Sequence, residues 1–483
     1  MNVLQFGGKK MKKDLWIGGE YRKPASYMEL RNPYNLELLA EIGTADVEDV
    51  QSAISAAHQA QTIMAEMPAF ERAEILEKVA GSLKQDREEC ARLIAMEAAK
   101  PLKAARAEVD RTIMTYTFAA HEARRIHGET VPMDAAPGGQ GRLAFTIREP
   151  LGVIAAITPF NFPMNLVAHK VGPAIAAGNS IVLKPASQTP LSAYKIAEYF
   201  HSAGLPAGAL NVITGSGSKI GDVLLKDERI KMITFTGSPE VGTYIRENSG
   251  LKRVTLQLGS NSALIVDDGV GLDTVIPRIV NGAFAYQGQV CISIQRIFVH
   301  ANLFETFVDQ FVSETQKLKA GNPLEEDTDI SAMITRGDVE RTKEWVDEAV
   351  NHGAQLRFGG NSEGGIFQPT VLVNVPASEK VSCEEVFAPV VHINTFTEFE
   401  EAITLVNESK FGLQAGIFTN DIHKALRAAK KLEVGGVMIN EIPTFRVDQM
   451  PYGGVKMSGM GREGIKYAVE EMTELKLISF KTE

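Results

Sequence analysis

The sequence predicts an α/β protein in which a doubly wound parallel sheet is followed by a second α/β unit. From residue 151 onward, fully apolar runs such as 153–157 and 180–184 alternate with stretches of helical period. Apolar strands that alternate with helices are typical of a parallel sheet covered on both faces. The length of 483 residues exceeds what one hydrophobic core sustains, which predicts more than one domain.

The segment before residue 151 predicts short extended pieces followed by helices. Residues 15–43 contain short extended stretches that are separated by turns. Apolar residues at helical spacing then predict a helix from Asp46 onward and further helices over 70–87, 88–99 and 102–125. The charged faces of these helices are expected to lie against solvent.

Strands and helices alternate between residues 151 and 258. Besides the two apolar runs, strands are expected at 211–213, 232–235 and 254–257, and a helix at 164–177. Another helix is expected between Pro190 and Gly204, because proline favours the first turn of a helix and glycine its end.

A second α/β unit is expected from about 262 to 470. Its predicted strands are 263–266, 296–299, 391–394 and 436–439, and its predicted helices are 271–287, 302–318, 338–352, 398–407 and 422–431. The excursion 129–149 looks two-stranded, and the run 475–480 alternates like a strand. A lone hairpin is marginal in water, so the excursion is expected to pack on something else, such as another subunit. The final strand 475–480 can pair with it.

Composition and charge limit the possible functions. The formal net charge of −10 argues against nucleic acid as a partner. The three cysteines, Cys90, Cys291 and Cys383, indicate a reducing compartment and no disulfide framework. The N-terminal lysines precede Asp14 rather than an apolar core, and no apolar run reaches the length of a membrane helix. We therefore expect a cytoplasmic location. We expect neither a signal peptide nor a membrane partner.

One cysteine stands in a setting that suits chemistry. Gly288, three residues before Cys291, permits backbone conformations that hold a thiol at a tight turn. The alternating residues after Cys291 predict a strand that leads away from this turn. A lone cysteine is more often a small buried apolar residue than a nucleophile, so the surrounding motifs decide.

Two loops that follow predicted strands carry polar groups. Residues 158–163 read Thr-Pro-Phe-Asn-Phe-Pro at the carboxyl end of the first parallel strand, where ligands of such sheets bind. Asn161 can donate to an oxyanion there, although an asparagine bonded to local backbone is the plainer interpretation. In residues 235–242, Ser238 can cap a helix whose N-terminus suits pyrophosphate, although an ordinary strand–helix turn is a serious alternative.

Six stretches together resemble the aldehyde dehydrogenase superfamily over nearly the whole chain. They are Pro159–Pro163, Lys184–Pro190, Phe235–Ser238, Gly288–Cys291, Glu384–Pro389 and Pro451–Gly459. Within the superfamily, the chain resembles a bacterial and archaeal branch that oxidises small polar aldehydes, with lactaldehyde dehydrogenases as the nearest type. Non-phosphorylating glyceraldehyde-3-phosphate dehydrogenases and phosphonoacetaldehyde dehydrogenases are cousins. The resemblance implies an oxidoreductase that converts an aldehyde to its carboxylic acid with NADP or NAD, without a metal site.

The resemblance implies a role for each matching residue. Cys291 would be the nucleophile that forms a thioester, and Asn161 with the Cys291 backbone N–H would form the oxyanion hole. Cofactor contacts are implied for Thr158, Pro159, Lys184, Ser187, Gly237, Ser238, Glu385 and Phe387. Substrate contacts are implied for Phe162, Asn165, His169 and Arg446.

One position departs from the family pattern. The hydrolytic branches carry a glutamate that activates the deacylating water, and this chain has Gln257 in that place. A neutral amide can orient a water but cannot take its proton. Either another group such as Glu385 or Glu474 takes over, or coenzyme A accepts the acyl group, or the chain is impaired, up to a cofactor-binding pseudoenzyme. An engineered change is a further alternative.

Other departures bear on specificity. Asn165 and His169 share a helix face that lines the substrate tunnel in this family, which predicts a short hydroxylated or weakly anionic aldehyde. The plainer interpretation of His169 is a helix-face histidine with satisfied bonds. Arg446 can add positive charge, whereas Val290 stands where phosphate-using cousins carry arginine. Ser187 stands where NAD-preferring members often carry glutamate, so NADP is expected to bind at least as well as NAD.

The resemblance also divides the chain. Residues 14–128 and 150–258 would form a dinucleotide-binding domain, and residues 259–472 a catalytic domain. Residues 129–149 and 473–483 would form a β-strand oligomerisation flap. Unpaired strand edges in this flap would invite pairing with another copy, which predicts a homodimer or a homotetramer.

Overall fold

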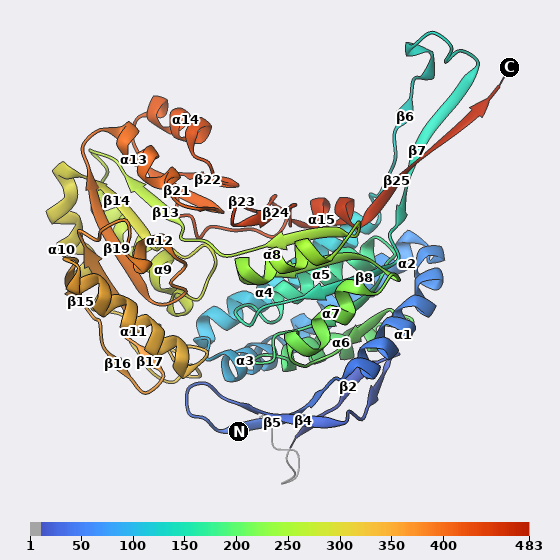
Figure 1. Ribbon diagram of the computed structural model, residues 1–483, viewed down its shortest axis with the longest axis horizontal. Coiled ribbons are helices and arrows are strands. Elements are labelled where there is room, and N and C mark those ends of the chain that lie inside the picture. The colour runs from blue at the N-terminus through green and yellow to red at the C-terminus, as the bar shows by residue number, and fades with distance from the viewer. Residues whose placement is uncertain (1–10, 483) are drawn as a thin grey trace.

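The structure is a computed structural model that describes residues 11–482. Residues 1–10, on which the expectation of no signal peptide partly rests, lie outside the described residues. Two large sheets with helices packed on them form the body, and a narrow arm projects from it (Figure 1). The predicted α/β class is confirmed. None of the helices in the described part of the chain has the length and apolar character that crossing a membrane requires.

The predicted helices of the first half are confirmed, with small shifts at their ends. They are α1 (Val47–Glu66), α2 (Ala69–Gln85), α3 (Arg87–Ala98), α4 (Leu102–Ala123), α5 (Asn165–Ala176), α6 (Leu191–Ser202), α7 (Gly217–Lys226) and α8 (Pro239–Asn248). Asp46 begins α1 through a reciprocal capping box with Asp49. Ala99 ends α3 with a left-handed backbone, φ 47°.

The first sheet contains the predicted parallel strands. Its members are β2 (Leu15–Ile17), β3 (Glu20–Arg22), β8 (Val153–Ile157), β9 (Ser180–Lys184), β10 (Leu210–Val212), β11 (Ile230–Thr236), β12 (Arg253–Gln257) and β24 (Gly459–Met460). Their order is β24-β12-β11-β8-β9-β10-β2-β3, and β8 to β12 run parallel. The chain therefore winds outward from β8 to β10, returns to the other side of β8 and continues to β12.

The second sheet has the order β15-β18-β19-β14-β13-β21-β22. These strands are β13 (Ala263–Val266), β14 (Arg296–His300), β15 (Gln355–Phe358), β18 (Thr370–Val373), β19 (Val390–Phe396), β21 (Gln414–Phe418) and β22 (Gly436–Ile439). Its helices are α9 (Leu272–Phe284), α10 (Phe304–Thr315), α11 (Arg336–Asn351), α13 (Phe399–Asn407) and α14 (Ile422–Lys431). The sequence analysis missed β15, β18 and β21, whose runs are short or carry glycine or arginine.

The arm consists of the three-stranded sheet β25-β7-β6. Its strands are β6 (Thr130–Val131), β7 (Arg142–Pro150) and β25 (Thr473–Lys481). β25 pairs antiparallel with β7 from Thr473 opposite Pro150 to Lys481 opposite Arg142, which confirms the predicted pairing of these segments. The arm extends away from the body at the upper right of Figure 1.

Nine further strands and α-helices, together with three short 3₁₀ helices, complete the described part of the chain. The strands and α-helices are β1 (Lys12–Lys13), β4 (Ser26–Arg31), β5 (Leu38–Thr44), β16 (Ser362–Glu363), β17 (Ile366–Phe367), α12 (Lys380–Cys383), β20 (Phe411–Gly412), β23 (Val455–Lys456) and α15 (Ile465–Glu471). In the first sheet, β24 pairs with β12 and places Gly459 opposite Gln257. The late segment thus adds a strand to the early sheet, and the predicted domain boundaries stay a prediction.

Candidate active site

The winding of the first sheet places two polar loops side by side. β8 and β11 are neighbours in the sheet. After β8 the chain continues to β9, toward one edge of the sheet, and after β11 it continues to β12, toward the other edge. Such a switch point opens a crevice at the carboxyl ends of the strands, where ligands bind. Residues 158–164 follow β8, and Gly237 and Ser238 follow β11.

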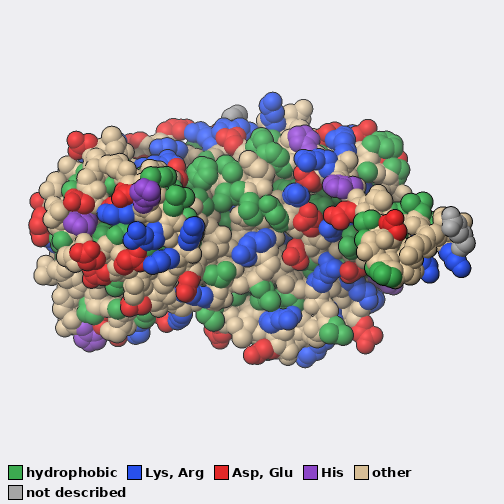
Figure 2. Space-filling model, turned by 90° about the horizontal axis from the view of Figure 1, so that it is seen from above, with side chains coloured by type: hydrophobic (Ala, Val, Ile, Leu, Met, Phe, Trp, Pro, Cys, Tyr) green, Lys and Arg blue, Asp and Glu red, His purple; other side chains and the backbone are tan. Residues whose placement is uncertain are grey.

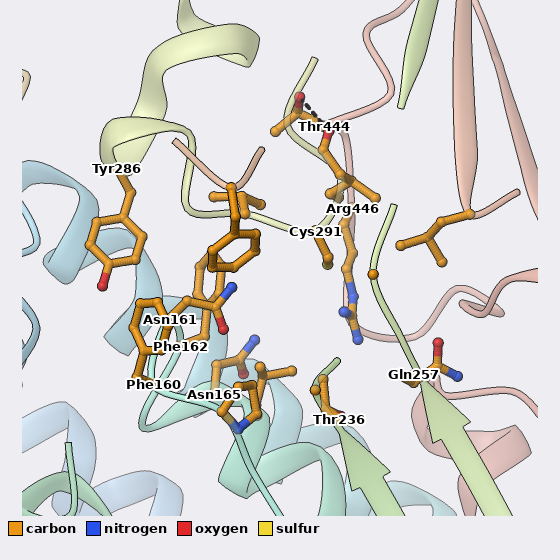
Figure 3. A pocket seen from close by; sticks show the side chains of 18 of the residues that line it. Phe160, Asn161, Phe162, Asn165, Thr236, Gln257, Tyr286, Cys291, Thr444 and Arg446 are labelled. Atoms are coloured by element: carbon orange, nitrogen blue, oxygen red, sulfur yellow. Dashed lines mark hydrogen bonds between the residues drawn. The ribbon is translucent and has the colours of Figure 1, made fainter. Parts of the chain in front are cut away.

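A cavity of about 600 Å³ lies at this crevice. Its wall combines loops of the first sheet with segments 285–292, 385–387 and 444–452 of the second unit. Figure 3 shows Cys291 within it, with Asn161 on one side and Arg446 on the other. The cavity therefore brings the predicted nucleophile and the predicted oxyanion donor together.

A strained turn presents Cys291 to the cavity. Tyr286, Gln287 and Gly288 all have left-handed backbones, with φ of 50°, 53° and 67°. At Gly288, a Cβ atom would lie 2.2 Å from the carbonyl oxygen of Ala388, so glycine is required there. The two non-glycine residues need support from their surroundings to hold this conformation.

Side-chain bonds supply that support. The Tyr286 hydroxyl donates to the Ala98 carbonyl at 3.0 Å. The Gln287 amide donates to the carbonyls of Ala99 (3.1 Å) and Ala332 (2.9 Å). Both side chains are buried, so the turn is anchored to the end of α3.

The thiol lies in a buried and charged environment. Cys291 Sγ is 2.8 Å from the Tyr452 hydroxyl. The guanidinium of Arg446 stacks 3.6 Å from the centroid of the Tyr452 ring and donates to Glu463 at 3.1 Å. Burial raises the pKa of the Cys291 thiol, while the Tyr452 hydrogen bond and the charge of Arg446 oppose that rise.

Asn161 faces the thiol from the other sheet. Its Nδ2 donates to the Gln289 carbonyl at 3.0 Å, which leaves its second N–H for a ligand. The backbone carbonyl of Asn161 accepts a hydrogen bond from Lys100 Nζ at 2.6 Å. Lys100 in turn forms an ion pair with Glu108 in which both side chains are almost wholly buried.

Glu108 and Lys100 were missed by the sequence analysis, which expected solvated faces on the early helices. That expectation is wrong for α4, because this helix buries Glu108, Thr112 and Thr115 against the site. Glu108 accepts the backbone N–H groups of Met164 (2.9 Å) and Asn165 (3.2 Å) at the start of α5. The sequence offered only a weak signal for this burial, which is that Glu108 stands one helical turn before the polar residue Thr112.

Gln257 lines the cavity without a carboxylate. Its Nε2 donates weakly to the Tyr452 carbonyl at 3.4 Å, and its buried Oε1 has no hydrogen-bond partner among residues 11–482. Of the two candidate substitute bases, Glu385 lines the cavity and Glu474 does not. Glu474 lies in β25 and pairs with Arg253 at 2.8 Å.

Two cavity carboxyl groups differ in their readiness to take a proton. Burial raises the pKa of Glu385 to about 7, against a hydrogen bond from the Ser260 N–H. Burial would also raise the pKa of Glu463, but the charges of Lys170 and Arg446 lower it to about 2. Glu463, which sequence analysis also missed, is therefore a fixed negative charge at neutral pH.

The predicted substrate residues fall into two groups. Phe162, Asn165 and Arg446 line the cavity. The structure does not bring His169 to it, because this side chain is fully buried with Nε2 2.8 Å from an oxygen of Asp448. Arg111, which sequence analysis did not single out, lines the cavity and donates to Asp448 at 2.7 Å.

Five of the eight predicted cofactor residues line the cavity, and three lie beyond it. Pro159, Gly237, Ser238, Glu385 and Phe387 line the cavity. Thr158, Lys184 and Ser187 lie beyond this lining, at and after the ends of β8 and β9.

These residues fit a dinucleotide. Ser238 caps α8 and accepts the Val241 N–H at 3.4 Å, which leaves an exposed helix N-terminus beside the crevice. A Cβ atom at Gly237 would lie 2.4 Å from the Phe235 ring, so the backbone there stays bare for a phosphate. Glu385 offers a carboxyl group suited to ribose hydroxyls.

A comparison with known families assigns the class of protein. The model of the aldehyde dehydrogenase family matches residues 21–478, and the chain belongs to this family. It is an NAD(P)-dependent aldehyde dehydrogenase, as its sequence resemblance implied. The predicted aldehyde dehydrogenase-like fold is confirmed as well.

Similar proteins span almost the whole chain. The chain is 48% identical to 3-sulfolactaldehyde dehydrogenase of Priestia aryabhattai, over 96% of this chain and 97% of that protein. It is 40% identical to lactaldehyde dehydrogenase of Methanococcus aeolicus, over 97% and 100%.

Two solved structures are also similar. Aldehyde dehydrogenase 21 from Physcomitrella patens in complex with the reaction product succinate has a TM-score of 0.96 and 42% identity, over 98% of this chain and 99% of that one. Glyceraldehyde-3-phosphate dehydrogenase GapN from Methanocaldococcus jannaschii complexed with NADP has a TM-score of 0.91 and 40% identity, over 94% and 99%.

Proposed function

We propose that this enzyme oxidises a short aldehyde with a hydroxyl or anionic substituent to its carboxylic acid, through a thioester on Cys291. The observation that carries the proposal is the shared cavity of Cys291, Asn161 and Arg446. The buried guanidinium offers an anion a partner beside the nucleophile, because its Nε has no partner among the residues the structure describes. Relatives named for lactaldehyde and sulfolactaldehyde, and a neighbour solved with succinate, support this substrate class.

The residues of the cavity account for the acylation half of the reaction. The Cys291 thiolate attacks the aldehyde carbon, and the carbonyl oxygen becomes an oxyanion. The free N–H of Asn161 and the backbone N–H of Cys291 donate to that oxygen. The bound nicotinamide supplies a hydride acceptor. Loss of hydride from the former aldehyde carbon leaves an acyl group joined to Cys291 as a thioester, which water must then cleave.

An aldehyde panel with both cofactors tests this function. We expect lactaldehyde, glycolaldehyde and succinic semialdehyde to exceed hexanal and benzaldehyde in kcat/KM by about tenfold or more, because an apolar chain leaves buried polar groups of the cavity unpaired. A Cys291→Ser variant serves as the control and should lose oxidation. Preference for long aliphatic or aromatic aldehydes would contradict the proposed substrate class.

Two alternatives have their own outcomes. Release of an acyl-coenzyme A when coenzyme A is added would identify an acylating enzyme. A complete lack of Cys291-dependent hydride transfer across the panel would favour a cofactor-binding protein without catalysis.

Gln257 should slow deacylation far more than hydride transfer. A positioned general base typically contributes about 10²–10⁴-fold, and Gln257 cannot take a proton from water. Rapid mixing should show a burst of reduced cofactor, at most one per active site, and then a slow phase. Gln257→Glu should accelerate the slow phase at nearly constant burst size, while Gln257→Ala should change little.

The competing interpretation is that Glu385 has taken over as the base, which its pKa of about 7 permits. In that case no burst appears, and Gln257→Glu gains nothing. Mass spectrometry of enzyme quenched during the slow phase decides independently, since a stalled acyl group must be found on Cys291.

NADP should bind at least as tightly as NAD. Ser187 is small and neutral and follows Lys184, whose charge can pair with a 2′-phosphate. Ser187→Glu should weaken NADP binding about tenfold or more through like-charge repulsion and leave NAD less affected. Ser187→Gln provides a neutral control of the same length. Titration of each cofactor measures the effect, and tighter wild-type binding of NAD would count against the prediction.

The arm is proposed to join subunits into a homodimer or homotetramer. Its apolar side chains Leu143, Leu475, Leu477 and Phe480 are each more than half exposed. Figure 2 looks down on the arm at its right-hand side and shows hydrophobic side chains among the polar ones. Exposed apolar residues on strands with free edges mark a surface that another chain covers.

Removal of residues 474–483 should therefore give monomers or insoluble protein, because β7 loses β25, one of its two partner strands. Removal of residues 482 and 483 alone is the matched control and should leave the assembly intact. Light scattering measures both, and a monodisperse monomer for the full chain would refute the proposed assembly.

A further inference from the structure

The nucleophile lacks an obvious means of losing its proton. Gln257 is neutral, and burial favours the uncharged thiol. Among the charged groups that act on Cys291, Glu385 and Glu463 disfavour the thiolate, whereas Arg446 favours it. The guanidinium alone must then offset burial and two carboxyl groups, unless a hydrogen-bond donor meets the sulfur.

The Tyr452 hydroxyl is placed to act as such a donor. Its hydroxyl oxygen lies 2.8 Å from Cys291 Sγ, and its side chain is buried in the cavity wall. Burial raises the pKa of the Tyr452 phenol well above 10, so the hydroxyl keeps its proton at neutral pH. It can therefore donate to a thiolate without losing that proton.

The position of Tyr452 is fixed from two directions. Its backbone N–H donates to the Glu463 carbonyl at 3.0 Å, and the Glu463 N–H donates back at 2.6 Å. Its ring packs beneath the guanidinium of Arg446, with 3.6 Å between the guanidinium carbon and the ring centroid. The hydroxyl is thus held against the sulfur before any substrate arrives.

We propose that the Tyr452 hydroxyl activates Cys291 by donating a hydrogen bond to its thiolate, with Arg446 stacked on the ring as the accompanying positive charge. This proposal rests on the proposed role of Cys291 as the nucleophile. In the ionisation, the S–H bond breaks, its proton leaves to solvent, and the electron pair stays on sulfur. The phenol O–H remains intact and turns toward the sulfur.

The bond favours the thiolate selectively. A hydrogen bond to an ionised acceptor is roughly twice as strong as one between neutral groups. A neutral thiol is a weak donor and a weak acceptor, so it gains little from the same phenol. Tyr452 therefore stabilises the reactive form of Cys291 more than the resting form, as a catalytic residue that touches the reacting atom.

The test measures Cys291 alkylation by iodoacetamide as a function of pH, without cofactor or aldehyde. In Tyr452→Phe, we expect alkylation near neutral pH to be about tenfold slower and the midpoint of the pH profile to move upward. Phenylalanine keeps the ring under Arg446 and removes only the hydroxyl. Peptide mass spectrometry assigns the label to Cys291.

The chain offers a matched control. Cys90 Sγ lies 3.4 Å from the Tyr199 hydroxyl in a buried site outside the cavity lining. Tyr199→Phe removes the same group from another cysteine and should leave the Cys291 profile unchanged. An unchanged or accelerated profile in Tyr452→Phe would overturn the proposal.

Two further measurements keep the outcomes distinct. If Tyr452→Phe does not fold, incorporation of 3-fluorotyrosine into the wild-type chain makes the phenol a stronger donor and should accelerate alkylation of Cys291; an unchanged rate would sink the idea. Retention of aldehyde oxidation by Cys291→Ser would instead defeat the proposed function itself, whatever the alkylation profile shows.

Discussion

The buried ion pair of Lys100 and Glu108 is the interaction on which the site depends. Both side chains are almost wholly withdrawn from water, so each charge needs the other and every remaining hydrogen bond. Glu108 uses one oxygen for the backbone N–H groups that begin α5, and Lys100 uses its amine for the Asn161 carbonyl. Loss of either partner would leave an uncompensated charge, which typically costs about 3–5 kcal/mol.

The same lysine reaches the turn that presents Cys291, the proposed nucleophile. Its amine lies 3.7 Å from the centroid of the Phe162 ring and 4.4 Å from that of Tyr286. Burial lowers the pKa of Lys100 to about 8, against the favourable charge of Glu108. One cation therefore contacts both the loop that carries Asn161, the proposed oxyanion donor, and the left-handed turn before Cys291, and it couples the two halves of the cavity.

The sequence predicts the parallel strands and the motifs well, because apolar runs and glycine-rich turns are local signals. β8, β9 and β13 lie where their apolar runs are. The six family stretches supply six of the cavity's polar residues, namely Asn161, Thr236, Ser238, Cys291, Glu385 and Tyr452. Glu108 and Arg111 escaped notice because charged residues in a helix are ordinarily solvated. Only the docking of α4 against α5 turns them inward, and this contact joins distant segments. His169 was predicted to line the cavity and does not. It is spaced from Asn165 as predicted, but its hydrogen bond with Asp448 holds its side chain outside the cavity lining.

In the hydrolytic branches of the family, one glutamate orients the deacylating water and takes its proton. In this cavity, these two tasks would fall to different residues. Glu463 is locked as an anion by Lys170 and Arg446, so it can balance charge but cannot take a proton at neutral pH. Glu385 has a pKa near neutrality, but a dinucleotide bound against it would engage the same carboxyl group. Gln257 can orient a water and no more. Under the proposed mechanism, the cavity supplies the thiolate and the oxyanion donors for acylation, and the cofactor accepts the hydride. Deacylation lacks the carboxylate in place of which Gln257 stands, and Glu385 could act as the base only when the cofactor does not engage it. The proposed mechanism therefore makes the two halves of the reaction depend on different residues.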